Sequence, residues 1–195
     1  MKKRLCSALL IGLSTAGCGS SPKPQYYTLQ APPPPTLHSS IAGTAQPEIV
    51  IAPITLPEAV DRTQWVMRTG DNTLEISDAH RWAEPLQSGI ARVLAANLSQ
   101  LLDTPSVTAF GAHAATDQAI RVNVEITAFE SSPGQDATIA ALWTIKRPGN
   151  NQPLSGRSVA RETPDDNGYP AMAAAYSRAL TQISREIAAA LRGAR

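Results

Sequence analysis

Apolar residues recur every three or four positions in two segments of the chain, which is the spacing of an amphipathic helix. The first segment starts at Pro85 and ends before Asp103-Thr104-Pro105; its apolar positions are Leu86, Ile90, Val93, Leu94, Leu98, Leu101 and Leu102. The second starts at Pro170; its positions are Met172, Tyr176, Ala179, Leu180, Ile183, Ile187 and Leu191. Proline suits the first turn of a helix, because its missing N–H needs no partner there. Two helices are predicted.

A period of two, typical of strands with one solvated face, runs through residues 120–126 and 138–145. The turn Ser132-Pro133-Gly134 separates them, so we expect an antiparallel pair. Residues 48–54 form a β-branched run typical of a strand buried on both faces. Shorter strands are predicted at 65–68 and 74–76, joined by the turn Gly70-Asp71-Asn72, and at 106–110 and 158–163. The class predicted is α+β, an antiparallel or mixed sheet of about five to seven strands packed against two amphipathic helices.

The N-terminus has the order of an export signal. Lys2-Lys3-Arg4 precede an apolar stretch from Leu5 to Leu13, and small residues lead into Cys18. The apolar stretch is shorter than the roughly 20 residues that span a bilayer. Residues 1–17 are therefore predicted to be a cleaved signal peptide. The alternative cut, by an ordinary signal peptidase nearby, leaves Cys18 as a free thiol, since Cys6 departs with the signal and no disulfide partner remains.

Small residues running into Cys18 resemble a lipobox, with Thr15 where leucine is usual. The resemblance implies that Cys18 carries a diacylglycerol and an N-acyl chain, and several acyl chains give stable anchoring. Gly19, rather than the aspartate that retains many proteobacterial lipoproteins in the inner membrane, implies the periplasmic face of the outer membrane.

Proline is concentrated after Cys18, which indicates a linker region. We divide the mature chain into residues 18–46, comprising the lipidated cysteine, a tether, a short strand at 26–29 and the Pro32–Pro35 loop, and residues 47–195, a single periplasmic domain. In the alternative, all of 19–46 is disordered linker.

Charge and motifs exclude several functions. The 17 basic and 16 acidic residues leave a net charge of +1, so no global field favours nucleic acid. His38, His80 and His113 are scattered through predicted loops without zinc-ligand spacing. No nucleophile elbow, phosphate loop or dinucleotide fingerprint is present. We expect no enzyme activity, no metal and no cofactor beyond the acyl groups on Cys18. A hydrolase with a dispersed Ser/His/Asp triad is the alternative from another class.

A cation, a large aromatic and a carboxylate gather at the entry to the first helix: His80, Arg81, Trp82 and Glu84. In one interpretation Trp82 caps the core and its charged neighbours pair locally. In the other the group is a docking patch, because Trp and Arg are enriched at interface hot spots. The pair Asp61-Arg62 allows the same two interpretations.

Several stretches in order resemble the ABC-type transport auxiliary lipoproteins, the PqiC/YmbA-like group that accompanies MCE-domain lipid transport systems. They are residues 26–29 after the cysteine, 49–57 ending in Leu-Pro, 61–68, and 80–86 running into 91–98. Thr15 and Thr63 depart from the family pattern.

The resemblance implies a non-catalytic outer-membrane subunit of an intermembrane transport system for lipid or hydrophobic solute. It would act as an anchor and docking adaptor, meet a periplasmic MCE protein, self-associate and support envelope integrity. The alternative is a periplasmic lipoprotein that carries lipid itself.

Overall fold

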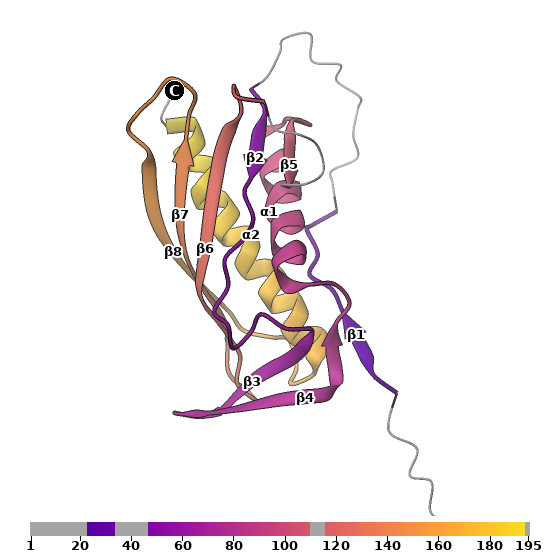
Figure 1. Cartoon of the computed structure of the whole chain (residues 1–195). Coiled ribbons are helices and arrows are strands. Elements are labelled where there is room, and N and C mark those ends of the chain that lie inside the picture. Colours follow the sequence, from indigo (N-terminus) through magenta and orange to yellow (C-terminus); the bar gives the residue numbers. More distant parts are fainter. Residues whose placement is uncertain (1–22, 34–46, 110–115, 194–195) are drawn as a thin grey trace, which may run out of the picture.

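The computed structural model describes residues 23–33, 47–109 and 116–193 (Figure 1). These residues form eight strands and two helices. In chain order they are β1 (Gln25–Tyr27), β2 (Ile49–Ile51), β3 (Gln64–Gly70), β4 (Thr73–Trp82), α1 (Leu86–Leu102), β5 (Val107–Ala109), β6 (Ile120–Glu130), β7 (Ala137–Lys146), β8 (Leu154–Glu162) and α2 (Tyr169–Gly193).

Both predicted helices are confirmed, and α1 begins and ends where its sequence indicates. Pro85 is the residue before the first turn, and Asp103 after the last turn takes the left-handed conformation with φ 51°. The backbone N–H of Asp103 then bonds the carbonyl of Gln100, and that of Thr104 bonds the carbonyl of Ser99. A left-handed residue at this position satisfies carbonyls that the helix leaves free.

The larger sheet has the strand order β5-β2-β6-β7-β8. The predicted pair β6–β7 is antiparallel, as expected, and β8 is antiparallel to β7. β2 is parallel to both of its neighbours, and all three of its residues are buried. The long β-branched run therefore forms a central strand, as its lack of polar positions predicts.

A second sheet, of order β1-β4-β3, corrects the prediction of a single sheet. β4 does not end at Ile76 but continues to Trp82, because β1 pairs with its last residues in parallel register, Gln25 opposite His80 and Tyr27 opposite Trp82. His80 is thus in a strand and not in a loop. A strand pairing between residues so far apart in the chain leaves no local sequence signal.

The α+β class is confirmed, and each of the eight strands overlaps a segment that the sequence predicts as a strand. β8 starts at Leu154, ahead of the predicted Ser158, because it pairs along nearly all of β7. The alternative of a fully disordered 19–46 is wrong for residues 23–33. Tyr27 and Leu29 belong to the same core as the helices, so the folded unit includes residues placed ahead of the predicted boundary at 47.

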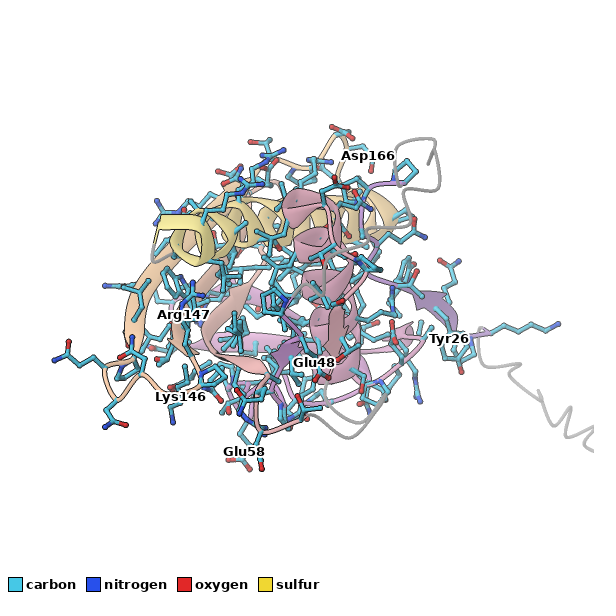
Figure 2. The ribbon with its side chains drawn as sticks, turned by 90° about the horizontal axis from the view of Figure 1, so that it is seen from above. Tyr26, Glu48, Glu58, Lys146, Arg147 and Asp166 are labelled. Atoms are coloured by element: carbon cyan, nitrogen blue, oxygen red, sulfur yellow. The ribbon has the colours of Figure 1, made fainter. Side chains whose placement is uncertain are left out.

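The two helices lie side by side on one face of the larger sheet (Figures 1 and 2). Asn97 of α1 donates to the hydroxyl of Ser184 of α2 at 3.2 Å and to that of Thr181 at 3.4 Å, so a small polar group lies between the two helices. At the other side of α2, Trp143 Nε1 donates to Ser158, whose hydroxyl donates to Glu186. These bonds tie β7 and β8 to the helix that covers them.

Among the described residues, no helix is long and apolar enough to cross a membrane.

Candidate functional site

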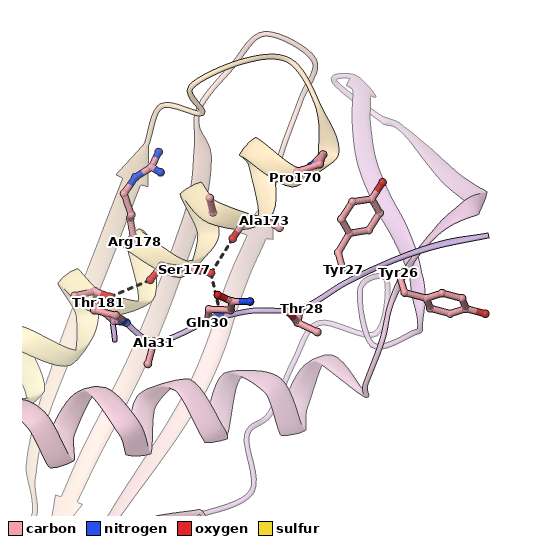
Figure 3. A pocket seen from close by; sticks show the side chains of 12 residues that line it. Tyr26, Tyr27, Thr28, Gln30, Ala31, Pro170, Ala173, Ser177, Arg178 and Thr181 are labelled. Atoms are coloured by element: carbon pink, nitrogen blue, oxygen red, sulfur yellow. Dashed lines mark hydrogen bonds between the residues drawn. The ribbon is translucent and has the colours of Figure 1, made fainter. Parts of the chain in front are cut away.

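Residues 23–33, which we call the N-terminal segment, are built into the fold. Beyond the β1–β4 pairing, the N–H of Ala83 bonds the carbonyl of Tyr27 at 2.8 Å. Arg92 of α1 donates to the carbonyl of Leu29 at 2.8 Å, and the Leu29 side chain is only 1% exposed. Gln100 donates to the carbonyl of Pro32 at 2.8 Å. The segment is therefore held along its length, as Figure 3 shows where it passes between α1 and α2.

A groove of about 570 Å³ lies between this segment and α2 (Figure 3). One wall is the N-terminal segment, from Tyr26 to Pro32, and the other is the first half of α2, from Pro170 to Thr181. Its lining is mostly hydrocarbon, contributed by tyrosine rings, prolines and alanines. The residues are Tyr26, Tyr27, Thr28, Gln30, Ala31, Pro32, Pro170, Ala173, Ala174, Ser177, Arg178 and Thr181.

The hydroxyls in the α2 wall of the groove are hydrogen-bonded within the protein. Ser177 donates to the carbonyl of Ala173 at 2.8 Å and accepts from the N–H of Gln30 at 3.1 Å. Thr181 donates to the carbonyl of Ser177 at 3.1 Å. Ser177 thus bridges the two walls, and both hydroxyls already have partners within the protein. This wall therefore presents mainly carbon to the groove.

Arg178 at the rim is held by acidic neighbours. Its Nε donates to Glu162 at 3.0 Å, and its guanidinium is 3.7 Å from Asp165 and donates to the carbonyl of Thr163. Exposed ion pairs of this kind contribute little to stability, about 0–1 kcal/mol each. Their effect here is on charge, since the cation at the groove is balanced by two carboxylates.

An aromatic cluster lies behind β1 and closes that end of the core. Trp65 stacks on Trp82 with ring centroids 4.3 Å apart, and Tyr176 stacks on Phe129 at 3.9 Å. Burial raises the pKa of Tyr176 well above the ordinary 10.0, with smaller effects from Ser131, which lowers it, and Glu130, which raises it. The Tyr176 hydroxyl is thus neutral over the whole physiological range.

Tyr27 connects this cluster to the surface. Its hydroxyl donates to Gln25 at 2.8 Å and is 2.7 Å from Nδ1 of His80, whose ring stacks on Tyr169 at 3.7 Å. Desolvation by burial, and then the neighbouring Tyr169, raise the pKa of Tyr27 above 10.0. The network joins β1, β4 and the start of α2, three elements that are far apart in the chain.

The structure separates the residues predicted as a docking patch. Trp82 is 5% exposed and packs in the core, so it caps the core as the first interpretation holds. Arg81 donates to the carbonyl of Asp78, and Glu84 pairs with Arg92 at 2.5 Å. These local pairs also match that interpretation.

Asp61 and Arg62 remain at the surface in the loop between β2 and β3. Asp61 accepts a hydrogen bond from Gln87 of α1 at 2.9 Å. This loop therefore lies beside the start of α1.

Cys18, His38 and His113 lie outside the described residues. Within the parts of the chain that the structure describes, no three His, Cys, Asp or Glu side chains are grouped as metal ligands are.

The groove was not predicted from the sequence. One signal could have shown its α2 wall: Ala173, Ser177 and Thr181 follow each other at intervals of four and form a line of small side chains on one helix face. The opposite wall had no such signal, because only the folding of the N-terminal segment onto α2 creates it.

The fold and site define a class of protein: a single α+β domain with an N-terminal segment built into its core and a groove beside that segment. Over residues 27–188 the chain matches the family model described as the ABC-type transport auxiliary lipoprotein component. The chain belongs to this family.

Two curated relatives share its full length. The chain is 25% identical over 193 residues to the intermembrane transport lipoprotein PqiC of Escherichia coli K12, covering 96% of this chain and 98% of the relative. The values for PqiC of Shigella flexneri are the same.

Two crystal structures share the fold. An uncharacterized protein superposes with a TM-score of 0.70 at 20% identity, over 87% of this chain and 99% of the other. Protein XCC0632 from Xanthomonas campestris superposes with a TM-score of 0.66 at 17% identity, over 84% and 92%.

Proposed function

We propose that this auxiliary lipoprotein is the outer-membrane subunit of an MCE-domain intermembrane lipid transport system. Its role is that of an anchored docking adaptor that supports envelope integrity without catalysing a reaction. Family membership supports a role in transport. The relatives named as intermembrane transport lipoproteins support transport between two membranes.

The observation that carries the adaptor role is the way the N-terminal segment is held. Pairing with β4, burial of Leu29 and the bonds from Arg92 and Gln100 leave the segment little freedom relative to the domain. A lipid on Cys18 would then fix the position of a rigid body, and not only the end of a loose tether.

Covalent geometry limits how far the domain can stand from its anchor. The five residues from Cys18 to Lys23 can span at most about 18 Å. β1 and the C-terminal end of α2 are at opposite ends of the molecule (Figure 1). In this proposal the end that carries β1 stays within reach of the outer membrane. Asp61, which bonds Gln87 at the start of α1, lies at that same end, and a partner that spans the periplasm reaches it there.

The docking surface in this proposal is the exposed pair Asp61 and Arg62, the second of the two groups that the sequence predicts for docking. Trp82 contributes by packing beneath it and not by touching the partner. The partner is an MCE-domain protein that spans the periplasm, and the chain also self-associates in the assembled system.

Mass spectrometry of the membrane-extracted protein tests the anchor. We expect a mature chain that starts at a triacylated Cys18 and fractionates with the outer membrane, and a Cys18→Ala variant that does not. A wild-type chain without acyl groups, recovered in the soluble fraction, contradicts the proposal.

A photo-crosslinking residue placed at Arg62 tests the docking surface in cells. We expect it to capture an MCE-domain protein, while the same residue at Gln152, in the turn between β7 and β8, serves as the control at the other end of the domain. Capture from Gln152 alone would move the docking surface to that turn, and capture from neither position would refute the adaptor role.

A further inference from the structure

We propose that the groove between the N-terminal segment and α2 binds one acyl chain of a phospholipid drawn from the membrane that carries the protein. The source of the lipid rests on the proposed function, because anchoring is what brings the groove to a bilayer. The affinity of the groove for hydrocarbon rests on the described residues alone.

The lining has the chemistry that an acyl chain requires. Pro170, Ala173 and Ala174 belong to one wall, and Tyr26, Ala31 and Pro32 belong to the other. The hydroxyls of the α2 wall are hydrogen-bonded to the protein itself. A polar solute would find few free partners there, whereas hydrocarbon leaves no polar group of that wall newly unpaired.

The dimensions match a single chain. From Pro170 to Thr181 the helix advances about 16 Å at 1.5 Å per residue. Half of the roughly 30 Å hydrocarbon core of a bilayer is about 15 Å, which is the depth that one acyl chain fills in its leaflet. The volume of about 570 Å³ lies within the range of small-molecule sites.

The position of the groove gives a lipid access to it. Tyr26 borders the groove at the end where the chain leads back to Cys18, and its side chain is 62% exposed (Figure 2). The eight residue steps from Cys18 to Tyr26 can span at most about 29 Å. An anchored domain therefore keeps this end of the groove close to the lipid surface, where tyrosine is a favoured residue.

The charges at the groove give no preference for one phospholipid headgroup over another, so the acyl chain determines binding. Arg178 is the cation of the lining, and Glu162 and Asp165 already balance it. An anionic headgroup gains no unpaired cation from the lining residues themselves. We therefore expect zwitterionic and anionic phospholipids with the same acyl chains to bind alike.

The test uses the mature, acylated protein in vesicles of phosphatidylethanolamine and phosphatidylglycerol that contain a trace of phosphatidylethanolamine with a photoreactive acyl chain. After irradiation and digestion, adducts are mapped by mass spectrometry. We expect them in residues 24–33 and 170–181. The same label on phosphatidylglycerol should give the same map.

Ala174→Trp fills the groove, because Ala174 lines it and is exposed, so a large side chain meets no core residue. Ala189→Trp is the matched control, an exposed alanine of α2 beyond the groove. We expect Ala174→Trp to lose the adducts and Ala189→Trp to keep them, with similar thermal midpoints. If Ala174→Trp fails to fold, Thr28→Trp on the opposite wall replaces it.

Adducts that map elsewhere, or that survive in the folded groove-filling variants, would overturn the inference. Dependence on the phosphatidylglycerol headgroup would overturn its selection of the acyl chain. Mass spectrometry of the same preparations reports the acylation of Cys18, and the crosslinking from Arg62 in cells reports capture of the MCE-domain protein. An acylated, partner-bound protein without groove adducts refutes this inference only, whereas an unacylated protein without a partner refutes the proposed function.

Discussion

Leu29→Ala measures how much the N-terminal segment contributes to the folded domain. Leu29 precedes the region that the sequence marks as the domain, yet its side chain is 1% exposed and belongs to the core. Truncation of a fully buried leucine to alanine costs about 2–5 kcal/mol, from lost transfer free energy plus the cavity left behind. The lower half of that range is expected here, because a segment at the edge of the fold can relax into the space.

A loss of about 3 kcal/mol in the free energy of unfolding lowers the melting temperature by roughly 6–12 °C in a domain of this size. Urea denaturation followed by circular dichroism gives the free energy, and chymotrypsin cleavage after Tyr26 or Tyr27 reports release of the segment. Tyr26→Ala is the control, since its exposed side chain should change stability by no more than about 0.5 kcal/mol. If Leu29→Ala costs no more than this control, the segment is a tether and the argument for a rigidly held anchor fails.

Three further predictions concern single positions. Gly156→Ala places a Cβ 2.1 Å from the ring of Trp143, so we expect the free energy of unfolding to fall by about 1–3 kcal/mol and the tryptophan emission to change. Gly70→Ala is the control, because its Cβ has no neighbour closer than 3.6 Å and should change neither quantity. Because burial raises the pKa of Tyr176 above 10.0, the unfolded chain loses its proton first, and stability should fall above about pH 10 by up to roughly 1.4 kcal/mol per pH unit. Urea unfolding between pH 8 and pH 11 should show this fall shrink in Tyr176→Phe, and an unchanged slope would contradict the assignment. Asp103→Gly should raise the free energy of unfolding by about 0.5–1 kcal/mol and the thermal midpoint with it, because Asp103 has φ 51° and glycine adopts that conformation without strain. A lower midpoint would show that the aspartate side chain stabilises the turn.

Whether the predicted docking patch is buried or exposed could not be decided from its local sequence. The composition of residues 80–84 is that of an interface hot spot and equally that of a capped core. Trp82 is buried because β1 covers its strand and Trp65 stacks on it, and both partners come from other parts of the chain. Asp61 and Arg62 stay exposed, and the contact of Asp61 with Gln87 at the start of α1 again joins parts of the chain that no local pattern connects.

Family membership was accessible from the sequence, because it rests on runs of residues in order. The groove was not, because its two walls are about 140 residues apart in the chain and neither wall alone is unusual. A line of alanine, serine and threonine on a helix is compatible with close packing as well as with an open groove.

Periodic burial by itself determined the two helices, the β6–β7 pair and the central position of β2, since a period of 3.6 or 2, or an unbroken β-branched run, states which side of an element meets the core. Only the tertiary structure decided the second sheet, the extension of β4 to Trp82 and the place of Leu29 in the core. The addition of β1 to the second sheet and the place of Leu29 in the core depend on the parallel pairing of β1 with β4, more than 50 residues away in the chain. A contact at that distance is set by which surfaces remain unpaired once the local elements have formed, and no pattern within one segment records it.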